Sequence, residues 1–179
     1  MKHFKRRALR VSCTRVEPVP GWVLYLAASD RGLCQLNFAG EPEAFRQELE
    51  ARGYLVQWED PPRHPVLRQA AQQLVEYVQG KRRQFTVRLD LEGTAFQLCV
   101  WQALQAIPYG ETRSYREIAE AIGHPRSWRA VARANRDNPL PIFVPCHRVI
   151  RQNGALGGYR PGLEFKRRLL ELERRFKRA

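Results

Sequence analysis

The sequence predicts an α+β protein (α/β in the broad sense) with a small N-terminal α/β part, residues 1–90, and a mostly helical C-terminal part, residues 91–179. Three observations support this fold class. Short apolar runs separated by proline and glycine fill the beginning of the chain, as expected for strands. Apolar residues at helical spacing dominate the second part. Between the two parts, the stretch Asp90-Leu91-Glu92-Gly93 marks a boundary.

In the N-terminal part we expect three strands, then two helices, then a closing strand. The strands are predicted over residues 8–15, 22–28 and 32–38, the helices over 42–52 and 64–79, and the closing strand over 84–91. Proline and glycine after the first strand, and Asp30-Arg31-Gly32 after the second, supply the turns. No chemical motif lies in this part, which therefore reads as a scaffold.

The C-terminal part begins with a helix for which Thr94 is the expected N-cap. A shorter helix over residues 114–122 follows, then the break Gly123-His124-Pro125, then a helix over residues 126–135. A helix, a turn containing glycine and a second helix outline a helix-turn-helix, so we expect a winged-helix-like arrangement.

Four arginines are spaced so that they share one face of the second of these helices, while Trp128 and Val131 point elsewhere and can pack. The four are Arg126, Arg129, Arg133 and Arg136. Like charges on one helix face repel each other, and contact with phosphates would relieve that repulsion. A solvated cationic face is the alternative explanation, but the helix-turn-helix context favours nucleic acid.

The net charge of +13 is concentrated toward the C-terminus. Residues 1–80 hold 11 basic and 9 acidic side chains, whereas residues 151–179 hold 9 and 3. A basic field of this kind favours a polyanionic partner, either nucleic acid or an acidic membrane surface. No stretch is apolar enough to span a membrane, and no apolar signal core follows the basic residues 1–7. We therefore expect a cytoplasmic, nucleic-acid-binding protein.

The four cysteines, Cys13, Cys34, Cys99 and Cys146, are widely separated and form no Cys-x-x-Cys pair. A structural zinc site or a redox motif is therefore unsupported, and we expect no metal. An irregular site made by His3, Cys13 and Cys34 is a weaker alternative to inert thiols in the core of the sheet.

Cys146 differs from the other cysteines because it lies in Pro145-Cys146-His147-Arg148, inside the apolar run 141–150. The segment Ile142-Phe143-Val144 reads as a short buried strand that Pro145 ends. A thiol attacks as its thiolate, and positive neighbours lower the pKa of a thiol. Cys146 is therefore a candidate nucleophile, the alternative being a buried structural thiol.

The last predicted helix, residues 163–175, carries an apolar stripe formed by Phe165, Leu169, Leu172 and Phe176. Glu173 lies at the edge of that stripe. A glutamate facing the core needs a partner, either an arginine or a histidine. His147 is a candidate, because a carboxylate commonly orients the base of a nucleophilic site.

Eight segments of the C-terminal part, taken together and in order, resemble the alkylguanine-DNA alkyltransferases, also called methylated-DNA–protein-cysteine methyltransferases. They are Gly93-Thr94-Ala95-Phe96-Gln97, Val100-Trp101, Ile107-Pro108, Ser114-Tyr115, Arg129-Ala130-Val131, Asn138-Pro139, Pro145-Cys146-His147-Arg148-Val149 and Gly157-Gly158-Tyr159-Arg160. The resemblance covers residues 90–173.

The resemblance implies a DNA repair reaction in which an alkyl group passes from the 6-oxygen of guanine, and also from the 4-oxygen of thymine, irreversibly to Cys146. Such a protein acts once, as a monomer, on the minor groove of double-stranded DNA, without a cofactor or metal. It implies catalytic roles for Cys146, His147, Glu173 and Asn138, substrate contacts by Tyr115, Val149 and Tyr159, and DNA contacts by Ser114, Arg126, Arg129, Arg133 and Arg136. In particular, Arg129 is expected to fill the gap that an extruded nucleotide leaves in the base stack.

Two other functions remain to be compared with this one. A non-catalytic alkyltransferase-like protein would bind damaged DNA, but such proteins lack the acceptor cysteine that Cys146 supplies. An alkylation-sensing transcription regulator would need a second DNA-binding domain, which this sequence does not show.

Overall fold

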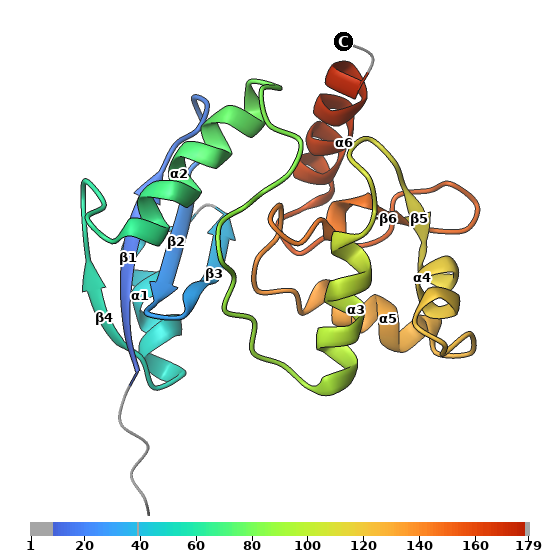
Figure 1. Cartoon of the computed structure of the whole chain (residues 1–179), viewed down its shortest axis with the longest axis horizontal. Helices are drawn as coiled ribbons and strands as arrows, with labels where there is room; N and C mark the ends of the chain where they lie inside the picture. The colour runs from blue at the N-terminus through green and yellow to red at the C-terminus, as the bar shows by residue number, and fades with distance from the viewer. Residues whose placement is uncertain (1–8, 39, 178–179) are drawn as a thin grey trace, which may run out of the picture. The chain divides into compact units, whose positions relative to one another are not determined.

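The computed structural model describes residues 9–38 and 40–177 (Figure 1). The chain forms two compact units. The first comprises Met1–Leu74 and Val87–Asp90, and the second comprises Val75–Thr86 and Leu91–Ala179. The segment Val75–Thr86 thus belongs with the C-terminal unit although it precedes residue 90 in the chain.

The first unit is built on a four-stranded sheet with the order β3-β2-β1-β4. Its strands are β1 (Arg10–Val16), β2 (Leu24–Ser29), β3 (Gly32–Phe38) and β4 (Leu55–Trp58). The first three confirm the sequence prediction and pair in an antiparallel manner, whereas β4 runs parallel to β1. Sequence reasoning missed β4, because a strand of four residues, three of them exposed, is too short to show an alternation of apolar and polar residues.

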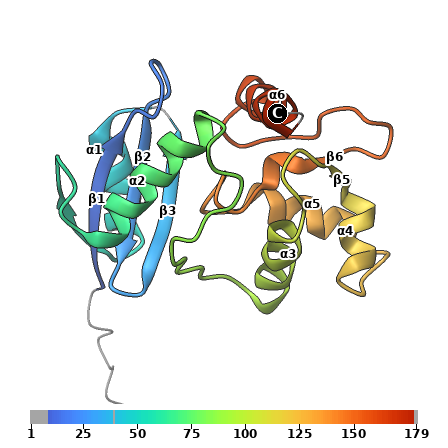
Figure 2. The ribbon, with the colours of Figure 1, turned by 45° about the horizontal axis from the view of Figure 1, so that its top comes forward.

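Two helices cover the two faces of this sheet: α1 (Pro42–Ala51) on one side and most of α2 (Pro65–Val78) on the other (Figures 1 and 2). Phe45 and Leu49 of α1 pack against Cys13 and Cys34 in the core. Burial raises the pKa of the Cys13 thiol to about 12. The expectation that these two cysteines are inert core thiols agrees with this packing. His3, the other residue of the alternative metal site, lies outside the described residues.

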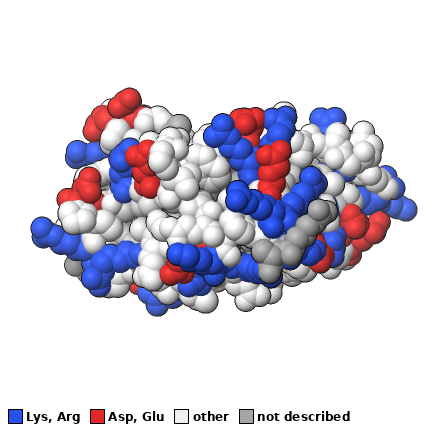
Figure 3. Space-filling view, turned by 90° about the horizontal axis from the view of Figure 1, so that it is seen from above, with Lys and Arg blue, Asp and Glu red and all other residues white. Residues whose placement is uncertain are grey.

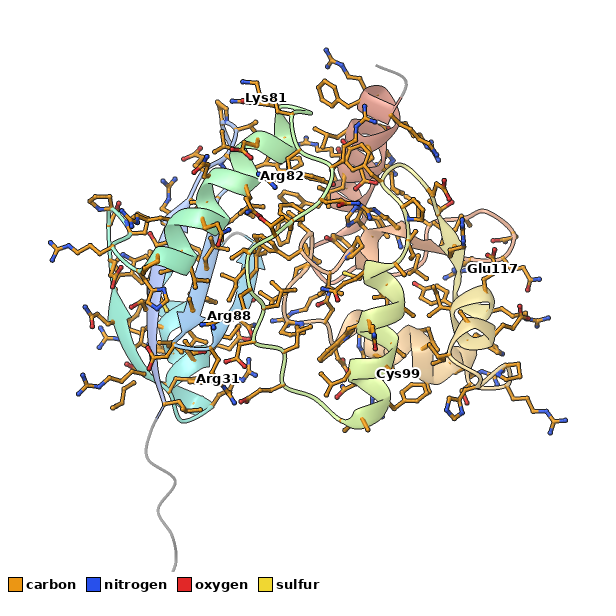
Figure 4. The ribbon with its side chains drawn as sticks, viewed as in Figure 1. Arg31, Lys81, Arg82, Arg88, Cys99 and Glu117 are labelled. Atoms are coloured by element: carbon orange, nitrogen blue, oxygen red, sulfur yellow. The ribbon has the colours of Figure 1, made fainter. Side chains whose placement is uncertain are left out.

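The predicted closing strand over residues 84–91 is wrong. In that segment only Leu89 forms a bridge, to Leu33, held by hydrogen bonds from Leu33 N to Arg88 O (2.8 Å) and from Asp90 N to Leu33 O (2.7 Å). Arg88 and Arg31, which are close in sequence to the two bridged residues, are labelled in Figure 4. The preceding residues leave the sheet because Phe85 packs in the second unit, against Phe143 with ring centroids 4.6 Å apart.

The second unit is mostly helical. Its elements are α3 (Ala95–Gln105), β5 (Arg113–Ser114), α4 (Tyr115–Ala121), α5 (Trp128–Arg136), the one-turn 3₁₀ helix η1 (Cys146–Arg148), β6 (Val149–Ile150) and α6 (Leu163–Lys177). Figure 2 shows α6 on one side of the β5–β6 pair and α3, α4 and α5 on the other. The predicted order of helix, glycine turn and helix is confirmed in α4 and α5. Within the described residues, no helix has the length and apolarity needed to cross a membrane.

The helix starts follow from local chemistry. Thr94 caps α3 and Ser114 caps α4, each through a capping box with the residue three positions later. Trp101 is buried in α3 and donates from Nε1 to Ala134 O (2.9 Å), which ties α3 to α5. Arg126 lies before α5 rather than within it.

The strand predicted over residues 142–144 is also wrong. Pro141 and Val144 are joined by a bridge across a tight turn, in which Ile142 has a φ of 76°. The segment is buried as expected, but local groups and not a neighbouring strand take up its backbone: Val144 N donates to Leu140 O (2.9 Å) and Cys146 N donates to Val144 O (2.7 Å). Asn138 Nδ2 donates to Val144 O (2.9 Å). Cys146 therefore begins a helical turn instead of ending a strand.

Helix α6 is rotated relative to the predicted stripe. Its buried residues are Lys166, Leu169, Leu170 and Glu173, whereas Phe165, Leu172 and Phe176 are half-buried. Glu173 lies within the buried face instead of at its edge. A prediction from the apolar side chains alone misplaced the buried face of α6. Two charged residues with buried partners, Lys166 and Glu173, also belong to that face.

Candidate active site

Cys146 lies at the first residue of η1 and is 3% exposed. Burial raises the pKa of its thiol to about 11, although a hydrogen bond with Asn138 and the positive charge of Lys166 oppose that rise. Lys166 does lower this pKa, as expected of a cationic neighbour, but the removal of the thiolate from water outweighs its effect. At neutral pH the resting group is a thiol.

His147 follows Cys146 and is fully buried. Its Nε2 lies 2.9 Å from Glu173 Oε1, so the predicted pairing of the two side chains is present. Burial lowers the pKa of His147 despite the carboxylate, which leaves a neutral imidazole at neutral pH. If Nε2 carries the hydrogen toward Glu173, Nδ1 is the nitrogen that can accept a proton.

Glu173 is the centre of a buried network. Besides His147, it accepts from Tyr77 Oη (2.7 Å), from Arg148 Nη2 (2.8 Å) and from the backbone N–H of Gly110 (2.8 Å). Burial alone would raise the pKa of this carboxyl, but the hydrogen bonds from His147 and Arg148 lower it well below the usual range. The carboxylate is therefore permanently charged, and it compensates the charge of Arg148.

Sequence reasoning missed Lys166, which is fully buried on α6. Its Nζ donates to Val149 O (2.5 Å) and to Gly157 O (3.3 Å), so it joins β6 to the glycine loop. Burial lowers the pKa of Lys166 to about 8. A sequence signal did exist, because Lys166 lies seven residues before Glu173 and thus on the same helix face.

Two asparagines hold the backbone at Cys146 and just before it. Asn138, a predicted site residue, donates to Val144 O and accepts from Leu140 N (both 2.9 Å). Asn135, which was not predicted, directs its Nδ2 toward Cys146 O (3.4 Å). Because both side chains are buried, they hold the backbone that carries the thiol in one conformation.

A cavity of about 850 Å³ opens in this unit. Its lining residues are Tyr115, Arg116, Trp128, Ala132, Arg136, Arg151, Gln152, Asn153, Gly157, Gly158, Tyr159 and Arg160. Tyr115 and Tyr159 lie close enough to Cys146 that, after burial, its charge is the next largest factor raising their pKa values. A Cβ at Gly157 would lie 2.3 Å from Tyr115 Oη, so the phenol requires glycine there. Val149 is buried and contributes its carbonyl to Lys166.

Basic side chains surround the cavity. Arg129, Arg133 and Arg136 are exposed on α5, and Arg126 is exposed just before it. Asp137 lies 3.5 Å from Arg136 and 3.9 Å from Arg133, so its carboxylate offsets part of the charge of these two arginines. Figure 3, in which the molecule is seen from above, shows Lys and Arg side chains interspersed with Asp, Glu and uncharged residues. Ser114 is buried, and its side chain accepts from Glu117 N at the start of α4.

A helix-turn-helix with a cationic face, set beside a buried thiol and a histidine–glutamate pair, defines a class of protein that brings a nucleophilic cysteine to a polyanion. Comparisons with known proteins identify the family within this class. Residues 95–175 match the DNA binding domain of 6-O-methylguanine DNA methyltransferase, and residues 16–91 match the ribonuclease-like domain of the same family.

Individual relatives agree. The constitutive methylated-DNA–protein-cysteine methyltransferase of Bacillus subtilis is 44% identical over 157 residues, covering 84% of this chain and 95% of that one. The Methanosarcina barkeri protein of the same name is 46% identical over 150 residues, with coverage of 84% and 89%. The crystal structure of Mycobacterium tuberculosis OGT in complex with DNA superposes with a TM-score of 0.77 at 40% identity, with coverage of 92% and 94%. This chain belongs to the 6-O-methylguanine DNA methyltransferase family.

Proposed function

We propose that this protein is a DNA repair methyltransferase that transfers a methyl or larger alkyl group from the 6-oxygen of guanine, and from the 4-oxygen of thymine, to its own Cys146. The observation that carries the proposal is the 2.9 Å contact between His147 Nε2 and Glu173 Oε1, adjacent in the chain to a buried thiol. Membership of the family supplies the substrate class.

The reaction is a direct displacement at a saturated carbon. His147 takes the thiol proton, through a water molecule, as the alkylated base approaches. The sulfur of Cys146 forms a bond to the alkyl carbon, the carbon–oxygen bond breaks, and its electron pair stays on the guanine oxygen. The product is a thioether, which has no leaving group of comparable quality, so each molecule reacts once.

The raised pKa of Cys146 fits this sequence of events. A thiolate in the resting protein would be alkylated by any small electrophile that reached it. A thiol with a pKa of about 11 is instead largely protonated at neutral pH. Proton transfer to a neutral His147 then accompanies attack. Glu173 holds the imidazole ring and stabilises the imidazolium that forms.

Tyr115 and Tyr159 line the cavity that would receive the base. A phenol with a pKa raised by burial stays protonated, so Tyr115 can donate its proton to the departing guanine as negative charge develops there. That donation balances the proton removed from Cys146, and the guanine leaves neutral. The pocket wall near Val149 and Tyr159 would surround the alkyl group.

The partner in this proposal is double-stranded DNA, approached from the minor groove by a protein monomer inside the cell. A base in a duplex must leave the stack before its 6-oxygen can reach a buried thiol. We assign Arg129 to the space that the base vacates, and Arg126, Arg133 and Arg136 to phosphate contacts. Ser114 uses both its side chain and its N–H in the cap with Glu117, so we assign it to fixing the start of α4 at the DNA surface. The displacement requires neither a metal ion nor a soluble cofactor, because the alkyl group passes directly from oxygen to sulfur.

The test is incubation with duplex DNA that carries a labelled methyl group on the guanine 6-oxygen. We expect one label per molecule on Cys146 and no transfer to Cys146→Ala. Label that remains on the DNA while the protein binds it tightly would instead support a non-catalytic binding protein. Sequence-specific protection of undamaged duplex would support a transcription regulator.

A further inference from the structure

Trp128 is a large apolar side chain that remains 38% exposed at the first residue of α5. Other large hydrophobic residues are exposed in the described part of the chain, but among them Trp128 alone lines the 850 Å³ cavity. It also borders the adjoining hollow that Arg129, Ala132 and Arg133 line on α5. The exposed part of this indole is apolar surface that remains in water and does not contribute to the core.

The guanidinium of Arg129 covers this indole, with Cζ 4.4 Å from the ring centroid. Consecutive residues on a helix point about 100° apart and do not normally face each other. The contact therefore requires the Arg129 side chain to fold back across the ring, where the attraction between a cation and an aromatic face holds it. Among the described side chains, no carboxylate forms an ion pair with Arg129, whereas Arg133 and Arg136 both approach Asp137.

We propose that Trp128 is a positioning residue for Arg129: its indole holds the guanidinium in the free protein, so that the arginine reaches the base stack already ordered. This inference rests on the proposed function, in which Arg129 occupies the space of the extruded nucleotide. An unrestrained arginine would lose its rotamer freedom only on binding, and ordering it beforehand removes that penalty from the extrusion step. Trp128 thus acts through Arg129 and makes no contact with the reacting atoms.

The experiment compares Trp128→Leu, which keeps apolar bulk, with Trp128→Phe, which keeps an aromatic face. For each variant the rate of methyl transfer from duplex DNA is divided by the rate from free O6-methylguanine, which needs no extrusion. We expect Trp128→Leu to lower this ratio about two- to fivefold, as a partly exposed cation–π contact implies. Trp128→Phe should keep most of the wild-type ratio. Equal ratios in the leucine variant and the wild type would overturn the proposal.

A double-mutant cycle separates positioning from direct contact. In an Arg129→Ala background, Trp128→Leu should change the duplex rate no further, because the side chain that it positions is gone. An additional loss of similar size would overturn the proposal and show that Trp128 touches DNA by itself. Methyl transfer from duplex DNA to Cys146 of the wild type tests the proposed function independently, so absence of that transfer identifies failure of the function and not of the positioning role. Since Trp128 is 38% exposed, Trp128→Leu should lower the thermal unfolding midpoint only slightly.

Discussion

Replacing Glu173 by glutamine tests the buried network on which the site depends. The carboxylate accepts from Tyr77, His147, Arg148 and the N–H of Gly110, using both oxygens. A glutamine keeps one oxygen, and its amide NH₂ must then face hydrogen-bond donors. The change also leaves the buried guanidinium of Arg148 without its counter-charge.

Breaking a buried ion pair by removing one partner destabilises a protein by roughly 3–5 kcal/mol. That is a large share of a total stability of about 5–15 kcal/mol. With a urea dependence of roughly 2 kcal/mol per M, the unfolding midpoint should fall by about 1.5–2.5 M. Glu171→Gln is the matched control, because Glu171 lies on the exposed side of the same helix and should leave the midpoint unchanged.

The assay is urea unfolding followed by tryptophan fluorescence, with methyl transfer measured on the folded fraction. We expect Glu173→Gln to slow transfer as well, since the imidazole of His147 loses its orienting partner. A midpoint within about 0.3 M of the wild type would refute the reasoning, since it would show that the paired charges contribute little net stability.

Acid titration gives an independent check on the same carboxyl. The folded pKa of Glu173 is lowered from its ordinary 4.5, so the stabilisation is complete above that value and is lost as the pH falls below it. The wild type should therefore lose stability more steeply below about pH 4.5 than Glu173→Gln does. Parallel pH curves for the two proteins would contradict this assignment.

Three further predictions follow from the geometry. Gly157→Ala should displace Tyr115, slow transfer, and destabilise the protein by about 1–3 kcal/mol, whereas Gly158→Ala, whose Cβ would meet nothing within 4 Å, should do neither. At neutral pH iodoacetamide should label exposed Cys99 (Figure 4) well before buried Cys146, as peptide mass mapping would show; faster labelling of Cys146 would contradict a raised pKa. Affinity for duplex DNA should fall steeply with added salt, and a salt-independent dissociation constant would refute phosphate contact by the arginines.

Local patterns in the sequence predicted several features correctly. The cap at Thr94, the α4–turn–α5 order and the first three strands were all anticipated, because each depends on residues close together in the chain. The strands predicted near residues 84–91 and 142–144 failed for the opposite reason. In the first, Phe85 packs against a residue far along the chain, and in the second, the side chain of Asn138 replaces a strand partner.

The sequence by itself determined the chemistry, because the eight ordered segments of the C-terminal part, with Pro145-Cys146-His147-Arg148-Val149 among them, indicated the family and its reaction. Only the tertiary structure decided the electrostatics of the site. Tyr77 reaches Glu173 across 96 residues, Lys166 is buried instead of solvated, and the pKa of Cys146 is raised where its neighbours in sequence suggested a fall. Burial and distant partners set these properties, and both arise only when the helices pack.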